Sequence, residues 1–342
     1  MTKHQKNSYL TVVLAGVVGI ALLFTACESP SEVVLSPFEE EKSYFEFVMK
    51  NDDFFKSEEE ILNDPDMNNV DKEILDGDNE IRPWRTLRRV LSIDRSFSYD
   101  FIDDTTAIVT MTRTMEVRLF ISGHMEPGEG NVWRDTLVTK DFTETATRKA
   151  RFVKVNDTGT AEDDWKLVDI SLLEGGTPER DFDIDRLKLD LPGDRSFEYD
   201  DPLNTFLRVG LGTREVPVVT LAVFRDDGYA LEITVRSTQE SPEMIYLRHG
   251  GVVGAQVGPG GYMRRMHVGS PVSTETTEAG EYIRRYVIDW DPFIELHNPV
   301  WRGEQIRRGR FSTVIEAVSY DTLHDIEAPV QTNYWGVPFI IE

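Results

Sequence analysis

Apolar residues recur at helical spacing in the first part of the chain and at every second position further on. Residues 37–50 predict a helix, and Ser57 with Glu60 resembles a capping box that opens a short helix ending at Leu62. Pro83 suits a first helical turn, so a third helix is expected from there. The apolar face of the first helix consists of Phe38, Phe45, Val48 and Met49. That of the third helix consists of Trp84, Leu87, Val90 and Leu91.

From Phe97 onward the period changes to two. Residues 107–121 alternate apolar and polar positions, which predicts a long strand with one buried face. Asp103-Asp104-Thr105 indicates a hairpin turn before it, and further strands are expected over residues 136–155 and 165–171. Helices followed by long one-sided strands predict an α+β domain with helices on one face of a curved antiparallel sheet.

This order of elements, with the stretch 104–110 and the closing strand Trp165-Lys-Leu-Val-Asp-Ile-Ser171, resembles the cone-shaped fold of nuclear-transport-factor-like proteins. The resemblance covers residues 37–173. It implies a cone-like α+β domain whose functional groups, where there are any, lie in a pocket between the sheet and the helices.

The second half of the chain indicates short strands and turns. Residues 174–205 are expected to form a linker, and residues 206–342 an all-β sandwich. Arg225-Asp226-Asp227-Gly228 is a hairpin signal between two of the expected strands. The last two strands resemble the closing strands of immunoglobulin-like domains, without the usual cysteine pair. The expected strands are residues 218–224, 229–236, 244–249, 252–257, 262–268, 282–290, 312–320 and 333–341.

The N-terminus carries a targeting signal. Lys3 and Lys6 precede an apolar run over residues 10–24, too short for a spanning helix, and the run ends at Phe24-Thr25-Ala26-Cys27. These residues resemble a bacterial lipobox, which implies removal of residues 1–26, lipidation of Cys27 and a lipidated tether over 27–36. Glu28 in place of Asp favours the outer membrane. The alternatives are an ordinary secretory signal or a short membrane anchor.

Composition narrows the classes of partner. The 342-residue chain has a formal net charge of −24 and one cysteine, so intramolecular disulfides and paired-cysteine zinc sites are excluded. Nucleic acid is not expected as a partner, because phosphate binding requires clustered basic residues. Residues 28–80 hold 18 acidic and four basic side chains, so the acidic excess lies close to the anchor.

Motifs for metals and cofactors are incomplete. The six histidines lack the spacing of zinc ligands on a helix, and residues 64–75 resemble a calcium loop but have Asn69 and Leu75 where Gly and Glu are needed. The glycine-rich stretch 250–261 has no Gly-Lys-Ser/Thr, so a phosphate cradle is not expected. No catalytic residue, metal or cofactor is therefore predicted.

Arg113 is the candidate ligand-binding residue. It falls on the apolar face of the strand over 107–121, where a buried guanidinium needs a carboxylate partner or a ligand anion. Trp84 is a candidate wall of the same pocket. The alternatives are a structural ion pair for Arg113 and a core position for Trp84.

These observations favour a lipid-anchored envelope protein with a non-catalytic binding or assembly role. Arginine pairs and aromatic residues in the sandwich region suggest a protein partner there, because such residues are enriched in interfaces; they are Arg264-Arg265, Arg284-Arg285 and Arg307-Arg308 with Tyr262, Tyr282, Tyr286, Trp290 and Trp301. The alternatives are a small-molecule enzyme or carrier that uses the pocket near Arg113, and a glycan-binding surface protein.

Overall fold

The structure is a computed structural model that describes seven stretches of the chain. They are residues 37–62, 81–125, 134–191, 195–209, 229–249, 264–290 and 309–341. The chain divides into two units, Met1–Glu40 and Glu41–Glu342. Cys27, the calcium-like loop and the glycine-rich stretch all lie outside the described residues.

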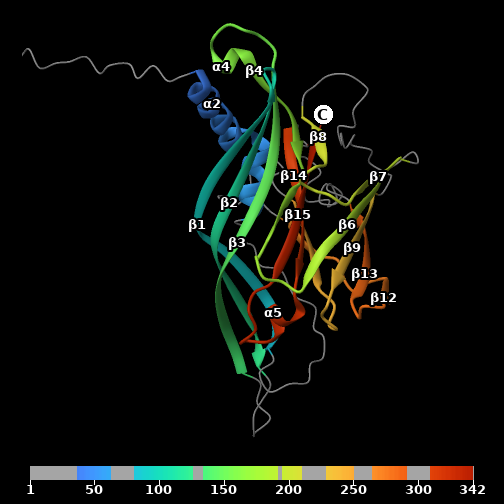
Figure 1. Cartoon of the computed structure of the whole chain (residues 1–342). Helices are drawn as coiled ribbons and strands as arrows, with labels where there is room; N and C mark the ends of the chain where they lie inside the picture. The colour runs from blue at the N-terminus through green and yellow to red at the C-terminus, as the bar shows by residue number, and fades with distance from the viewer. Residues whose placement is uncertain are drawn as a thin grey trace, which may run out of the picture. The chain divides into compact units, whose positions relative to one another are not determined.

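Two antiparallel sheets form the second unit (Figure 1). The larger sheet has, in the described part of the chain, ten strands in the order β1-β2-β3-β5-β15-β14-β10-β11, with β4 paired to β3 and β8 paired to β4. The strands are β1 (Ile81–Asp103), β2 (Thr106–Met125), β3 (Arg134–Lys154), β4 (Trp165–Ser171), β5 (Leu173–Gly176), β8 (Phe206–Arg208), β10 (Met244–His249), β11 (Arg264–His267), β14 (Gly309–Val318) and β15 (Thr332–Ile341).

The smaller sheet has five described strands in the order β12-β13-β9-β6-β7. They are β6 (Phe182–Leu191), β7 (Arg195–Tyr199), β9 (Tyr229–Ser237), β12 (Ser273–Thr276) and β13 (Tyr282–Trp290). One core cluster joins the two sheets face to face: Leu187 and Ile233 from the smaller sheet pack with Ile315 and Trp335 from the larger one. This sandwich core is apolar, so its burial supplies a large share of the folding energy.

Four short helices are described: α2 (Pro37–Asn51), α3 (Asp53–Leu62), α4 (Ala161–Asp164) and α5 (Tyr320–His324). The first helix was predicted correctly. The second begins at Asp53 rather than Ser57, because the side chain of Asp52 accepts a 3.0 Å hydrogen bond from the backbone N–H of Phe54. Ser57 is therefore inside α3, where its hydroxyl donates to the carbonyl of Phe54 at 3.0 Å.

The predicted third helix is wrong, because the chain from Ile81 to Asp103 is the long strand β1. Register shifts between Pro83 and Arg85 and between Val90 and Ser92 each insert one extra residue into the strand. Each bulge places inward-facing residues three positions apart, as with Val90 and Ile93, instead of two. Two bulges thus gave this strand an apolar spacing that is typical of a helix.

The fold prediction as a whole is also wrong. The protein is mostly β, with two antiparallel sheets and four short helices in the described chain, and it is not an α+β cone followed by a separate sandwich. The predicted strands over 107–121, 136–155 and 165–171 do exist, and a two-residue turn joins β1 to β2, where Asp103 accepts a hydrogen bond from the N–H of Thr105 at 2.7 Å. What differs is where they pair: β5 connects β3 with β15, so one sheet runs through both predicted domains.

The predicted linker, residues 174–205, contains most of β5 and all of β6 and β7. β5 belongs to the larger sheet, whereas β6 pairs with β9 in the smaller one. This stretch therefore connects the two sheets through paired strands. Its alternation, Phe182, Ile184, Leu187 and Leu189, is that of a buried strand face with one bulge.

The larger sheet curls, since side chains of strands far apart in the strand order meet inside it. Arg88 on β1 reaches Glu316 on β14, which is five positions along the sheet. Helix α3 lies within this curl and packs Ile61 and Leu62 against residues of β2, β5, β14 and β15. Figure 1 shows α2 and α3 beside the long strands β1, β2 and β3.

Candidate functional site

Arg113 lies in the middle of β2 with its side chain on the buried face, as its alternation with Met111 and Met115 predicts. The register places Ala146 of β3 opposite Arg113, so Arg148 is its diagonal neighbour on the same face. Both arginine side chains are 0% exposed. Two guanidinium groups are thus enclosed side by side in the interior of the curled sheet.

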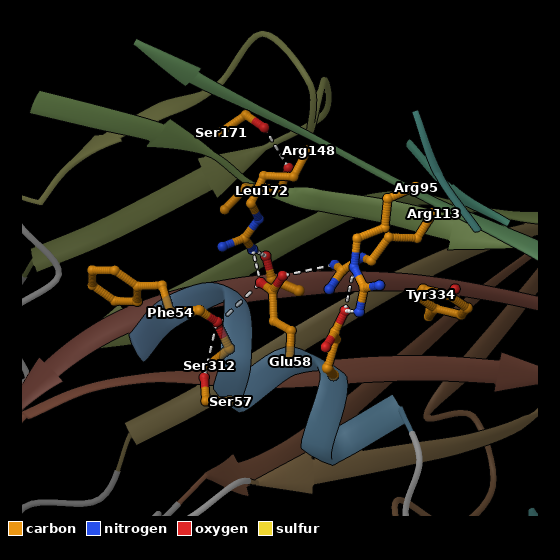
Figure 2. Close-up of polar contacts among 12 residues, drawn as sticks. Phe54, Ser57, Glu58, Arg95, Arg113, Arg148, Ser171, Leu172, Ser312 and Tyr334 are labelled. Carbon is orange, nitrogen blue, oxygen red and sulfur yellow. Dashed lines mark hydrogen bonds and ion pairs between the residues drawn. The ribbon is translucent and has the colours of Figure 1, made fainter. Parts of the chain in front are cut away.

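One carboxylate on α3, that of Glu58, pairs with both arginines (Figure 2). Its Oε2 accepts from Nη2 of Arg113 at 2.9 Å, and its Oε1 lies 2.5 Å from Nη2 of Arg148. Ser312 of β14 donates its hydroxyl to Oε1 at 3.1 Å, and Arg148 also donates to the carbonyl of Gly336 at 3.0 Å. These contacts connect a helix to four strands of one sheet.

Hydrophobic packing fixes α3 above the two arginines. Phe54, Phe55, Ile61 and Leu62 are all at most 2% exposed, and they flank Glu58 on the same helix. Spacing of four residues from Phe54 to Glu58, and four again to Leu62, puts the carboxylate within the apolar stripe of the helix. Glu58 therefore points into the sheet because its apolar neighbours do.

A second buried set of charges lies next to this one. Arg88 of β1 pairs with Glu144 of β3 and, at 3.2 Å, with Glu316 of β14. Arg248 of β10 also pairs with Glu316. The hydroxyl of Tyr334 on β15 donates to the carbonyl of Thr145 at 3.0 Å and lies 3.4 Å from Oε1 of Glu144.

Burial shifts the pKa values of two groups in this interior. Desolvation lowers the pKa of the Arg148 guanidinium to about 10, with the neighbouring charge of Arg113 acting in the same direction and Glu58 opposing it. Desolvation raises the pKa of the Tyr334 hydroxyl to about 12. At neutral pH Arg148 is therefore charged and Tyr334 is a neutral donor.

The arrangement is that of a structural ion-pair network rather than of an open pocket. Arg113 has the carboxylate partner that was one of its two predicted possibilities, and α3 covers that partner. Breaking such a pair on one side costs about 3–5 kcal/mol, because a buried charge is left uncompensated. The geometry gives Arg113 a role in holding α3 against the sheet.

Trp84 is not near Arg113 and not on a helix. It lies at the first bulge of β1, whereas the residue of β1 that pairs with Arg113 is Arg95, eleven positions further along the strand. Its side chain is 37% exposed, so it is not a core residue either. The two predicted ligand-binding residues are therefore not brought together.

Glu58, Arg148 and Ser312 were missed in the sequence. Arg148 shares the alternation of Ala146, Ala150 and the other buried residues of β3, which is the signal that identified Arg113 on β2. Glu58 could have been found as a carboxylate within the apolar stripe of a helix. Ser312 could not, because its position depends on how β14 pairs in the sheet.

The outer face of β1, β2 and β3 carries a group of apolar side chains at one end. Leu87 pairs with Phe120, and Leu137 lies diagonally across from Phe120 on β3. Leu137 is 62% exposed, and the exposed Trp84 is next to this set at the bulge. We call Trp84, Leu87, Phe120 and Leu137, with the exposed Arg85 and Arg89 beside them, the outer patch.

Two of the predicted interface residues of the sandwich region are buried, and Tyr262, Trp301, Arg307 and Arg308 lie outside the described residues. Arg284 is 1% exposed and donates to Glu243 at 2.8 Å, and Tyr286 is 0% exposed with its hydroxyl on the carbonyl of Glu243 at 3.1 Å. These two residues link β13 to the segment before β10. They stabilise the fold and are not part of a contact surface.

Comparisons of the chain with family models, with curated proteins and with solved structures find no match. Within the described stretches, no helix is long and apolar enough to cross a membrane. The same stretches contain no group of three or more histidine, cysteine or acidic side chains arranged to hold a metal ion.

Proposed function

We propose that this chain is a lipid-anchored cell-envelope protein with a non-catalytic binding or assembly role. The anchor is proposed from the sequence, where the single cysteine, Cys27, stands at the end of an apolar run in a lipobox-like context. An acyl anchor of more than one chain gives stable membrane attachment. The outer membrane is favoured by Glu28 directly after the cysteine.

The observation that carries the binding role is the outer patch. Trp84, Leu137 and the paired Leu87 and Phe120 place apolar surface on an exposed sheet face, next to charged groups. Tryptophan and arginine are the residues most enriched in the energetic centres of protein interfaces. A partner that buries the indole and matches the arginines with acidic groups has the chemistry that this surface requires.

The outer patch lies at the far end of the long strands from the residue that begins the second unit. Glu41 accepts a 3.0 Å hydrogen bond from the indole of Trp165, and Trp165 pairs with Lys154 at one end of β3. The outer patch lies at the other end of β2 and β3, about 50 Å away at about 3.3 Å per residue over some fifteen residues. Glu41, the first residue of the second unit, and the outer patch thus lie toward opposite ends of the long strands.

The pocket alternative has less support from the geometry. An enzyme or carrier that used Arg113 would need a route from solvent to its guanidinium, and that group is enclosed with Glu58 under α3. The ion pair with Glu58 gives Arg113 a structural role that does not depend on a substrate. We therefore propose the outer patch, and not the surroundings of Arg113, as the place where this protein meets its partner.

Site-specific photo-crosslinking in cells that express the protein tests this proposal. A photo-reactive amino acid at Leu137 is expected to give a discrete crosslinked product. The same group at Val155, which is 52% exposed and follows the other end of β3, is the matched control and is expected to give none. Arg85→Glu with Arg89→Glu should abolish the product at Leu137. Equal crosslinking at both positions, or none at either, would contradict the proposal.

A further inference from the structure

The pair of arginines beneath α3 carries more positive charge than the carboxylate in contact with it neutralises, and the neighbouring buried set, with two arginines and two glutamates, is balanced in itself. Arg113 and Arg148 contribute two positive charges, and within the seven described stretches Glu58 supplies the one carboxylate that contacts them. All three side chains are 0% exposed, so bulk water and salt do not screen the surplus. An uncompensated charge in a protein interior is among the most costly features that a fold can have.

The hydrogen-bond donors of the two arginines also outnumber the acceptors that contact them. Glu58 already accepts from Arg113, Arg148 and Ser312, and only one nitrogen of each guanidinium, Nη2, takes part. Nε and Nη1 of Arg113 and Nε and Nη1 of Arg148 are buried and have no hydrogen-bond partner among the described residues. Four buried donor nitrogens of the two guanidinium groups thus lack an acceptor in the described part of the chain, whereas buried polar groups are almost always paired.

We propose that Arg113 and Arg148 bind a small monovalent inorganic anion, of the size and charge of chloride, inside the curled sheet. One negative charge brings the sum of Arg113, Arg148 and Glu58 to zero. A divalent oxyanion such as sulfate would overcompensate, and it is also larger. A water molecule accepts hydrogen bonds from the free N–H groups but leaves the charge in place.

The identity of the groups also fits an anion. Guanidinium groups are always charged and offer several donors in a fixed plane, so they bind anions with directed hydrogen bonds. The pKa of Arg148 is lowered to about 10 by burial and by the charge of Arg113, and a bound anion would oppose both effects. The site would belong to the folded state alone, because it combines a helix with strands from both halves of the chain. Anion binding would therefore stabilise the fold.

Thermal unfolding in different sodium salts at constant ionic strength tests the proposal on the full chain without its signal. With gluconate exchanged stepwise for chloride or bromide, the melting temperature is expected to rise along a saturating curve, by about 3–6 °C once the anion exceeds its dissociation constant about 100-fold. Sulfate at the same ionic strength should not reproduce the saturating rise. A linear response, or one equal for all anions, would overturn the proposal.

Two variants separate a bound anion from general salt effects. Arg113→Met removes the surplus charge, so the chloride-dependent rise should disappear, whereas Arg118→Met, on the exposed face of the same strand, should keep it. Glu58→Gln leaves both arginines and adds a surplus charge, so its response to chloride should become steeper. Crystals soaked in bromide should show an anomalous peak beside Arg113 and Arg148. Ordered water there and no halide would contradict the inference.

Discussion

Replacement of Glu58 by glutamine gives the sharpest prediction about the interior. The change keeps the shape of the side chain and removes its charge, so Arg113 and Arg148 lose the carboxylate that contacts both. Loss of one partner from a buried ion pair costs about 3–5 kcal/mol. At about 1–2 °C per kcal/mol for a chain of about 300 residues, the expected fall in melting temperature is about 3–10 °C.

The neighbouring residue offers a matched control. Glu59 is on the same helix and pairs with Arg95, but the two side chains are 30% and 31% exposed. Glu59→Gln should change the free energy of unfolding by less than about 1 kcal/mol, because exposed pairs contribute little. The assay is urea unfolding of both variants, followed by circular dichroism, in the absence of chloride. Equal stability of Glu58→Gln and Glu59→Gln would show that the buried arginines do not depend on the charge of Glu58.

Three further predictions concern other parts of the chain. Lys140 donates to the carbonyls of Thr322, Asp325 and Ala328 at 2.9, 2.6 and 2.8 Å. Lys140→Met should therefore lower the free energy of unfolding by about 1–3 kcal/mol and speed backbone hydrogen exchange in the segment 320–330, and unchanged exchange there would count against this role. Burial lowers the pKa of His324, so the unfolded chain binds a proton at this residue more readily than the folded chain does, and the free energy of unfolding should fall as the pH drops below the unfolded pKa of about 6.5. His324→Gln should flatten this pH dependence in urea unfolding between pH 5 and 7, and an unaltered slope would contradict the role of His324. Cys27→Ser should release the protein from membranes in cell fractionation, and retention in the membrane fraction would argue against lipidation.

Much of the strand content was predictable, because one buried face imposes a strict period of two. β2 and β3 follow that period without a bulge between them, and both were predicted close to their observed bounds. β1 was mistaken for a helix since two bulges changed its period. A bulge is decided by the partner strand, so local sequence does not distinguish it from a helical turn.

The pairing of the strands could not be predicted from the sequence, for a different reason. Pairing between β5 and β15 joins residues near 175 to residues near 334, and no turn signal connects them. Gly175 packs against the ring of Tyr334 and the carbonyl of Thr145, so a side chain there would clash. The glycine pair at 175–176 suggested a linker, whereas the fold uses it for close approach between strands.

Only part of the candidate site could be predicted from the sequence. Arg113 was identified because a charged residue on an apolar strand face needs a partner, and the structure supplies that partner in Glu58. The identity of the partner of Arg113 could not be predicted, because it depends on the position of α3 inside the curl of the sheet. Trp84 was placed on the wrong element, so its exposure on the outer face could not be predicted.

Solvent exchange of the arginine side chains distinguishes a closed ion pair at Arg113 from an open pocket. In nitrogen-15 NMR at neutral pH, the Nε–H signals of Arg113 and Arg148, assigned by Arg113→Lys and Arg148→Lys, should exchange far more slowly than that of the exposed Arg118. Exchange of the Arg113 signal as fast as that of Arg118 would show that solvent reaches the guanidinium, and the pocket near Arg113 would again be the best candidate for the function of this protein.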